Sequence, residues 1–230
     1  MKLGLLGYPI NHSKSPELYK RLLSSRLTSY ELFSFKSQNQ IPPLNYFQER
    51  LDGLNITSPY KRHFFDQVLI ESDLVRSLGA INTVSFNSGL IRGTNTDLLA
   101  VLEILKSFSK QFINIKVILL GDGVMANVTK VAMENLSIPF IQLSRKINNN
   151  LVNFDLSVFY QENIQNIIIN SCSRDFIFQG SVNGDEIFWD YNYSFEPHQK
   201  LLPLRLKTYQ DGQLLLEIQA REAIKFWTEH

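Results

Sequence analysis

This chain of 230 residues has little cysteine, few long apolar runs and almost no net charge. The single cysteine, Cys172, excludes an internal disulfide and favours a reducing compartment. Apolar runs are short, as at residues 117–120, so none spans a bilayer, and the N-terminal stretch is too interrupted for a signal peptide. The 23 Lys and Arg residues offset 22 Asp and Glu residues, which argues against nucleic acid or an anionic membrane as a partner. We therefore expect a soluble, cytoplasmic protein.

Metal-binding patterns are also missing from the sequence. The four histidines lack the spacing of metal ligands, and one cysteine cannot build a zinc site, so no metal is predicted. Hydrophobic residues make up 44% of the chain and charged residues 20%, which excludes a disordered or fibrous protein. The length fits one large domain or two small ones with room for a core and a cleft.

Strands and helices alternate in the first part of the chain. Ser15 before Pro16 is typical of a helix N-cap followed by proline at the first helical position, and Ser58 before Pro59 repeats this signal. This order predicts a mostly parallel sheet in an α/β domain. The elements expected here are a strand at residues 3–8, a helix from residue 15, a helix at 43–51, a strand at 53–57 and a helix from residue 58.

The middle of the chain predicts a hairpin and then a nucleotide-binding unit. Residues 80–86 and 90–93 flank an Asn-Ser-Gly turn, which favours a hairpin. A strand, a tight glycine turn, a helix and a second strand then form a βαβ unit, the opening of a doubly wound domain. The elements expected are a helix from residue 98, strands at 116–120, 138–143 and 164–170, and helices at 125–136 and 212–227. Residues 146–163 give no clear prediction.

Polar residues gather at the strand-to-helix junctions of the first part. In an open α/β sheet these junctions lie at the carboxyl ends of the strands, where ligands bind. Neutral hydrogen-bonding groups around one cation and one anion suit a polyhydroxylated, neutral or monoanionic substrate better than a phosphate. The residues are Ser13, Ser15, Asn55, Thr57, Lys61, Asn82, Asn95, Thr96 and Asp97.

Lys61 is placed in the first turn of its expected helix. There the helix macrodipole disfavours a cation and a cleft would partly desolvate it, while a nearby Asp97 would hold the ammonium in place. A lysine tuned in this way can donate a proton to a developing alkoxide and take it back. The spacing is equally compatible with a plain Lys–Asp surface pair, and Ser15 with a simple helix cap.

Residues 121–123 (Gly-Asp-Gly) stand between a strand and a helix, the position of a dinucleotide-binding loop. The third glycine of such a loop is missing, and Asp122 puts a negative charge where phosphates would bind, so a tight turn of any doubly wound domain is an alternative. Residues 144–146 (Ser-Arg-Lys) end the next strand, where a Rossmann unit meets the adenosine ribose. Basic side chains there favour a 2′-phosphate, although a solvated basic pair is also compatible.

Five segments together resemble the shikimate dehydrogenase family. None is specific alone, but they occur in the family's order and cover residues 1–100 and the C-terminal end. They are residues 12–16 (His-Ser-Lys-Ser-Pro), 55–61 (Asn-Ile-Thr-Ser-Pro-Tyr-Lys), 79–83 (Gly-Ala-Ile-Asn-Thr), 93–97 (Gly-Thr-Asn-Thr-Asp), and Gln219-Ala220 with Phe226-Trp227-Thr228.

The resemblance implies a two-domain α/β fold with a cleft between the domains. Residues 1–97 with 209–230 would form a mostly parallel substrate-binding and catalytic domain, and residues 98–208 a Rossmann-like NADP-binding domain. The implied reaction is the reversible, NADPH-dependent reduction of 3-dehydroshikimate to shikimate in aromatic amino-acid biosynthesis. The implied assembly is a monomer or a homodimer.

The resemblance also implies roles, carried over position by position. Lys61 and Asp97 would be the catalytic pair, with Lys61 as proton donor and Asp97 orienting it and binding a hydroxyl. The implied substrate-binding residues are Ser13, Ser15, Thr57, Asn82, Tyr193 and Gln219. The implied NADP-binding residues are Gly121, Gly123, Val124, Ala126, Ser144, Arg145 and Lys146.

The glycine loop departs from the family's pattern, which is similar to Gly-x-Gly-Gly-x-Ala/Ser. Val124 would narrow the approach to the backbone, and an unscreened carboxylate on Asp122 would cost on the order of 1 kcal/mol or more beside a phosphate. We therefore expect NADP to bind more weakly than is usual in the family. The alternatives are a shikimate-binding paralogue that has weakened or lost cofactor binding, and a quinate/shikimate or NAD-dependent dehydrogenase. The retained Lys61 and Asp97 argue against the first, and the basic residues 145–146 argue against NAD.

Overall fold

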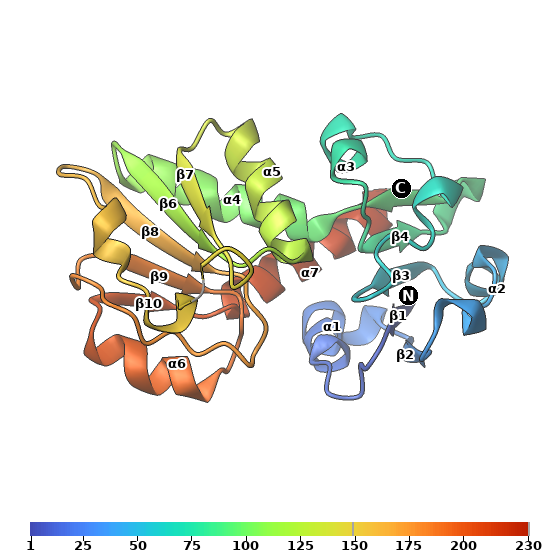
Figure 1. Ribbon diagram of the computed structural model, residues 1–230. Helices are drawn as coiled ribbons and strands as arrows, with labels where there is room; N and C mark the ends of the chain where they lie inside the picture. Colours follow the sequence, from blue (N-terminus) through green and yellow to red (C-terminus); the bar gives the residue numbers. More distant parts are fainter. Residues whose placement is uncertain (149, 230) are drawn as a thin grey trace. The chain divides into compact units, whose positions relative to one another are not determined.

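The chain folds as two units, seen in a computed structural model that describes residues 1–148 and 150–229 (Figure 1). The first unit holds Met1–Leu99 and the C-terminal residues from Glu217 onward, and the second holds Ala100–Leu216. The boundaries between the units fall within two helices, α4 (Thr96–Gln111) and α7 (Gln213–Glu229).

The first unit is built on a five-stranded sheet with the order β2-β1-β3-β4-β5. Strands β2, β1 and β3 run parallel, whereas β4 runs antiparallel to both of its neighbours, β3 and β5. The strands are β1 (Lys2–Gly7), β2 (Ser29–Ser34), β3 (Gly53–Ile56), β4 (Thr83–Ser85) and β5 (Arg92–Thr94). Its other helices are α1 (Ser15–Leu23), α2 (Leu44–Gln48) and α3 (Asp73–Leu78), with 3₁₀ turns η1 (Ser24–Arg26), η2 (Gln38–Gln40), η3 (Phe65–Gln67) and η4 (Asn87–Gly89).

Trp227 of α7 packs directly on the sheet of the first unit. Its indole is 1% exposed, and Nε1 donates to the carbonyl oxygen of Val84 at 2.8 Å. A Cβ at Gly53 on β3 would lie 2.3 Å from Nε1, so only glycine allows the ring to approach the strand this closely. The C-terminal helix is thereby held to the sheet by both burial and a hydrogen bond.

The second unit has an all-parallel sheet with the order β10-β9-β8-β6-β7. Its strands are β6 (Ile115–Leu120), β7 (Phe140–Leu143), β8 (Gln165–Asn170), β9 (Ile187–Asp190) and β10 (Thr208–Gln210). Besides parts of α4 and α7, its helices are α5 (Val124–Asn135) and α6 (Glu196–Leu201), with 3₁₀ turns η5 (Leu151–Asn153), η6 (Leu156–Phe159) and η7 (Leu202–Leu204).

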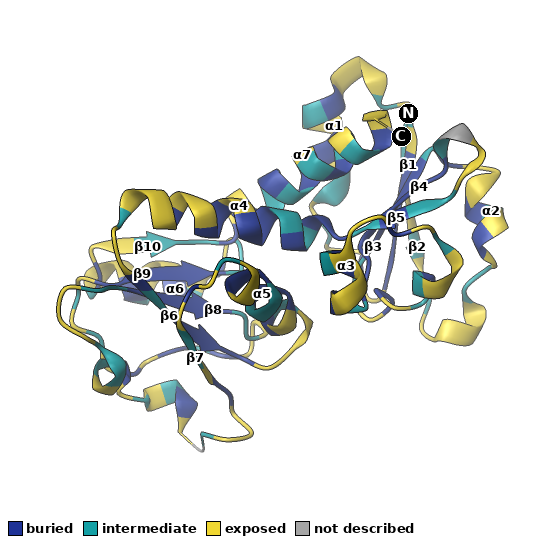
Figure 2. Cartoon of the chain, turned by 90° about the horizontal axis from the view of Figure 1, so that it is seen from above, coloured by how far each residue is buried: buried dark blue, intermediate teal, exposed yellow. Residues whose placement is uncertain are grey.

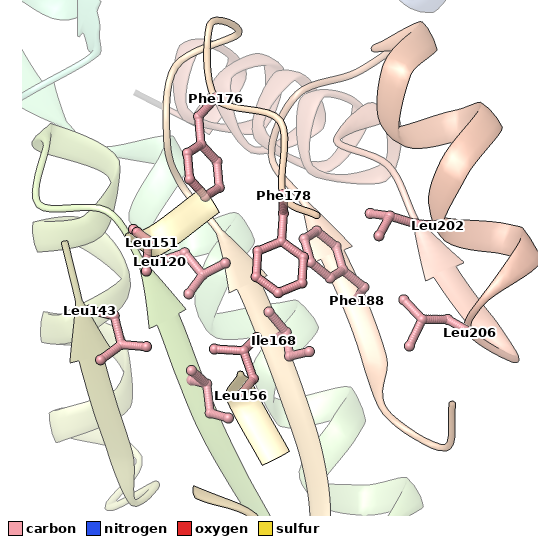
Figure 3. Close-up of a cluster of buried hydrophobic side chains, with 11 residues drawn as sticks. Leu120, Leu143, Leu151, Leu156, Ile168, Phe176, Phe178, Phe188, Leu202 and Leu206 are labelled. Carbon is pink, nitrogen blue, oxygen red and sulfur yellow. The ribbon is translucent and has the colours of Figure 1, made fainter. Parts of the chain in front are cut away.

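Helices cover both faces of this parallel sheet. Neighbouring side chains of β9 show this, because successive side chains of a strand point to opposite faces of its sheet. The Trp189 ring lies 6.0 Å from that of Phe108 on α4, whereas the Phe188 ring lies 5.7 Å from that of His198 on α6. The Phe188 face belongs to a cluster of buried apolar side chains that includes Leu120, Ile168, Phe178 and Leu202 (Figure 3). Burial of each large side chain contributes about 1.5–3 kcal/mol to folding.

Burial follows the expected layering. Figure 2 shows the central strands of each sheet as buried and the loops and outer helix faces as largely exposed. Edge strands β2 and β10 are exceptions among the strands, because none of their residues is fully buried. No helix in residues 1–148 or 150–229 is both long enough and apolar enough to cross a membrane.

The α/β class, the hairpin and the Rossmann-like βαβ unit expected from the sequence are confirmed. The helix expected from residue 58 is wrong, since residues 58–64 form turns and the Ser58–Pro59 peptide bond is cis. The cap expected for α1 is also wrong by one residue: Lys14 is the N-cap and Ser15 is the first helical residue. The elements that the sequence did not indicate are β2, α3, β9, α6 and β10.

Candidate active site

Lys61 and Asp97 form a close ion pair in the first unit. Lys61 lies in the turn after β3, where its carbonyl oxygen accepts a hydrogen bond from the Ile81 N–H, and Asp97 lies in the first turn of α4. The Lys61 Nζ is 2.5 Å from the Asp97 Oδ2, and the two side chains are only 11% and 14% exposed. A solvated surface pair is therefore excluded. This partial burial strengthens the interaction and leaves a small accessible area through which a ligand can reach the pair.

The helix macrodipole acts on the carboxylate of this pair. The sequence pattern predicted that it acts on the ammonium of Lys61. Lys61 belongs to no helix, so the macrodipole argument made for it is wrong. Asp97 instead sits at the positive end of the 16-residue α4, which stabilises its negative charge. An anionic Asp97 in turn holds the ammonium of Lys61 in place.

Asn82 and Asn95 fix the start of α4. The side-chain oxygen of Asn82 accepts hydrogen bonds from the Thr96 N–H at 2.7 Å and from the Thr96 hydroxyl at 3.1 Å. The buried Asn95 uses its side-chain oxygen to accept from the Leu98 N–H and its amide to donate to the Ala80 carbonyl. These contacts hold the backbone on both sides of Asp97. Because they use the side-chain oxygen of Asn82, the side-chain nitrogen is the group that can donate to a ligand.

A second polar chain runs through Asn55, which is 6% exposed. Its side-chain nitrogen donates to the Thr83 hydroxyl at 3.3 Å, and its side-chain oxygen accepts from the Tyr30 hydroxyl at 3.1 Å. The Tyr30 ring stacks on that of Tyr19 with centroids 5.2 Å apart. Burial raises the pKa of Tyr30 well above its usual value, opposed by a hydrogen bond with Ser15, so the phenol stays neutral and can donate to Asn55.

Ser13 and Ser15 both lie at the start of α1 and are partly exposed. The Ser13 hydroxyl accepts a hydrogen bond from the Ser15 N–H at 3.2 Å. The Ser15 hydroxyl is not the helix cap, because the N-cap position belongs to Lys14. The simple cap interpretation of Ser15 is therefore wrong. Both hydroxyls are partly exposed, and that of Ser15 is also hydrogen-bonded to Tyr30.

The other substrate-binding candidates are distributed between the units. Thr57 follows β3 directly, with its N–H donating to the Leu6 carbonyl. Gln219 on α7 belongs to the first unit and accepts from the Thr96 hydroxyl at 3.4 Å, which links it to the Asn82 contacts. Tyr193 belongs to the second unit, where its carbonyl oxygen accepts from the Arg174 guanidinium. The sequence did not single out Tyr30 or Tyr19 as supports of this site.

In the second unit, the glycine loop joins β6 to the N-terminus of α5. Gly121 has a φ of +115°, and a Cβ there would lie 2.6 Å from the Ser171 hydroxyl. An added Cβ at Gly123, the N-cap residue of α5, would meet no described atom within 4 Å. The 12-residue helix has no side-chain cap among the described residues, and the positive end of its dipole, which favours an anion, lies at this loop. This loop fits the pyrophosphate of a dinucleotide.

Val124 and Ala126 begin α5 directly after the loop. The Val124 side chain is 48% exposed at the surface, whereas Ala126 is fully buried under the helix. The small Ala126 lets α5 pack closely on the sheet. The narrowing expected from Val124 stays a prediction.

The strand-end residues after β7 supply the positive charge of this edge. Arg145 pairs with Asp175 at 2.9 Å, and Lys146 pairs with Asp122 at 2.9 Å. Asp175 raises the pKa of Arg145, which is therefore a permanent cation. Ser144 is 2% exposed, and its hydroxyl has no hydrogen-bond partner among the described residues. A guanidinium, an ammonium and this hydroxyl at one strand end form a donor set that suits a phosphorylated ribose. The sequence predicted an unscreened carboxylate at Asp122. That prediction is wrong, because Lys146 forms an ion pair with it.

Comparison with known proteins places these features in one family. Residues 5–84 match the shikimate dehydrogenase substrate binding domain. The chain is 30% identical to the shikimate dehydrogenase (NADP(+)) of Oceanobacillus iheyensis over an alignment 263 positions long, which covers 99% of this chain and 92% of that protein. It is 29% identical to the shikimate dehydrogenase (NADP(+)) of Clostridium botulinum strain Hall over 141 residues, so this second match spans 58% of the chain and about half (53%) of that relative.

Solved structures share the fold at lower sequence identity. The shikimate dehydrogenase of Aquifex aeolicus superposes with a TM-score of 0.77 at 22% identity, covering 100% of this chain and 93% of that one. The shikimate 5-dehydrogenase of Thermus thermophilus in complex with NADP(H) and shikimate gives a TM-score of 0.69 at 20% identity, covering 100% and 94%. Together with the near-complete match to the Oceanobacillus protein, these findings show that the chain belongs to the shikimate dehydrogenase family.

Proposed function

We propose that this chain catalyses the reversible, NADPH-dependent reduction of 3-dehydroshikimate to shikimate. The observation that carries the proposal is the Lys61–Asp97 pair, 2.5 Å apart and largely shielded from solvent, among neutral hydrogen-bonding groups of the first unit. The relatives named shikimate dehydrogenase (NADP(+)) support the choice of substrate and cofactor.

Ser13 and Ser15 would bind the carboxylate of the substrate. Both hydroxyls are partly exposed at the start of α1, and hydroxyl donors at a helix N-terminus suit an anion. Thr57, Asn82 and Gln219 would bind the ring hydroxyls and the carbonyl, with Tyr193 assisting at the carboxylate. The Asn82 side chain supports this role, because its oxygen is already held by Thr96.

Lys61 would supply the proton of the reaction. NADPH, when bound, supplies the hydride that reduces the ketone carbon. Negative charge then develops on the ketone oxygen, and the Lys61 ammonium stabilises that charge and donates the proton, a contribution of typically about 10²–10⁴-fold for a positioned acid. Asp97 would keep the ammonium oriented and accept a hydrogen bond from a substrate hydroxyl. In the oxidative direction the neutral amine of Lys61 takes the proton back.

The two units would divide these tasks. The first unit would be the substrate-binding and catalytic domain, and the second the Rossmann-like NADP domain. Gly121, Gly123, Val124 and Ala126 would accept the pyrophosphate at the N-terminus of α5. Ser144, Arg145 and Lys146 would face the adenosine ribose and its 2′-phosphate. The single, partly buried cysteine supports a cytoplasmic location, and we propose a monomer or homodimer as the assembly.

The test is a spectrophotometric assay of the purified chain at the nicotinamide absorbance band. Shikimate and quinate are each paired with NADP and with NAD. Turnover of shikimate with NADP well above the other three combinations is the expected result. Faster turnover of quinate, or of shikimate with NAD, would replace the proposed substrate or cofactor. Shikimate-induced thermal stabilisation without turnover under any pairing would show a binding protein and refute the enzymatic role.

A further inference from the structure

Asp122 and Lys146 join the two strand ends that would hold the nucleotide. Asp122 follows β6 within the glycine loop, and Lys146 follows β7 at the edge expected to meet the ribose. Their side chains form an ion pair at 2.9 Å, with Asp122 39% exposed and Lys146 81% exposed. The lysine is thus drawn toward the glycine loop, which is the proposed pyrophosphate position.

Arg145 is held by a different partner. Its guanidinium pairs with Asp175, and Asp175 also accepts a hydrogen bond from the Ser173 hydroxyl in the segment after β8. Two adjacent basic side chains are therefore directed to two separate acidic partners. If both basic side chains bound the same 2′-phosphate, they would not need separate acidic partners.

We infer that Asp122 is a positioning residue that assigns Lys146 to the pyrophosphate side of the site, leaving Arg145 to select the 2′-phosphate. This inference rests on the proposed use of NADP, and it moves Lys146 from the 2′-phosphate, where the family resemblance places it, to the pyrophosphate. The ammonium of Lys146 offsets the negative charge that Asp122 brings to the loop, so the first N–H groups of α5 keep their attraction for an anion. The planar guanidinium of Arg145 is the better match for a terminal phosphate.

The consequence is a difference between NADP and NAD, which share the pyrophosphate and differ in the 2′-phosphate. Loss of Lys146 should weaken both nucleotides by a similar factor, because its target is common to them. Loss of Arg145 should weaken NADP alone. Removal of Asp122 should release Lys146 toward the 2′-phosphate and raise the preference for NADP by about two- to fivefold, the range that an exposed ion pair can bias.

The experiment measures equilibrium dissociation constants for NADP and NAD by calorimetry, without substrate and without turnover. The variants are Lys146→Gln, Asp122→Asn, the double variant and Arg145→Gln. Lys130→Gln is the matched control, because Lys130 is a half-buried lysine of α5 that pairs with Glu134. Thermal unfolding of each variant checks that the fold is intact, as expected for exposed side chains.

The expected result for Lys146→Gln is about tenfold weaker binding of both nucleotides with an unchanged ratio of their dissociation constants. Asp122→Asn should raise the preference for NADP, and the double variant should return it to the parent value. A loss of NADP preference in Lys146→Gln like that in Arg145→Gln would overturn the inference, as would a raised preference that persists in the double variant. A parent chain that binds neither nucleotide would overturn the proposed cofactor together with the inference.

Discussion

Replacing Lys61 by alanine tests the proposed chemistry most directly. The change removes the proton donor, and it leaves Asp97 without the partner that lies 2.5 Å away. Loss of a positioned acid typically costs about 10²–10⁴-fold in rate. The remaining carboxylate would also repel the developing oxyanion, since two unit charges about 4 Å apart interact by roughly 4 kcal/mol near a protein surface. We therefore expect turnover to fall by at least about 10⁴-fold.

Substrate affinity should change far less than turnover. In the ground state Lys61 makes one hydrogen bond to an uncharged oxygen, which is worth about 1 kcal/mol, so binding should weaken by no more than about tenfold. Turnover is followed by NADPH absorbance and affinity by calorimetry with shikimate. Lys106→Ala, an exposed lysine on α4, is the matched control and should keep full turnover. A Lys61→Ala protein that folds, as checked by circular dichroism, and retains a tenth or more of the turnover would refute the role of this lysine.

Three other substitutions and one chemical modification test the fold and the nucleotide loop. Trp227→Phe removes a buried indole and its hydrogen bond, and should lower the free energy of unfolding by about 1–3 kcal/mol in urea titrations followed by circular dichroism. Gly121→Ala should destabilise the second unit, because its φ of +115° and the nearby Ser171 leave no space for a Cβ, whereas Gly123→Ala should fold normally and weaken NADP binding. Burial raises the pKa of Cys172 to about 11 from 9.0, so at pH 9 about one folded thiol in a hundred should be ionised and alkylation should be slow. Because folding favours the neutral thiol, this contribution to stability is present below pH 9 and is lost as the pH rises toward 11, and alkylation at equal rates in the folded and urea-unfolded chain would contradict it.

Local sequence signals predicted the elements whose side chains alternate or cluster clearly. Buried strands β1, β3, β6 and β8 and the hairpin of β4 and β5 are marked by apolar runs and turn residues. Strand β2 was missed because it is a sheet edge with no fully buried residue, so its sequence carries no apolar periodicity. The helix expected from Ser58 failed because a Ser-Pro pair marks a tight turn as readily as a helix start, and only the surrounding fold distinguishes the two.

The candidate site shows the same division between local and tertiary information. Lys61 and Asp97 were identified because each lies in a recognisable segment, although they are 36 residues apart. The contacts that hold them could not be read in this way. Tyr30 reaches Asn55 from an unrecognised strand, and Asn82 supports the start of α4 through its side-chain oxygen. Such supporting contacts depend on which strands are neighbours, which a short sequence window does not contain.

Asp122 in the glycine loop and Lys146 after β7 are better understood together than separately. Taken alone, Asp122 adds a charge that opposes a pyrophosphate, and Lys146 adds an opposite charge at a neighbouring strand end. In the structure these two residues are the two members of one ion pair, so the charge introduced by the first is offset by the second. The Val124 side chain, a further departure, is about half exposed at 48%. The electrostatic penalty expected from the sequence counted the charge of Asp122 without that of its partner. We therefore expect NADP affinity to depend on the pair as a whole, and to fall when Lys146 alone is removed.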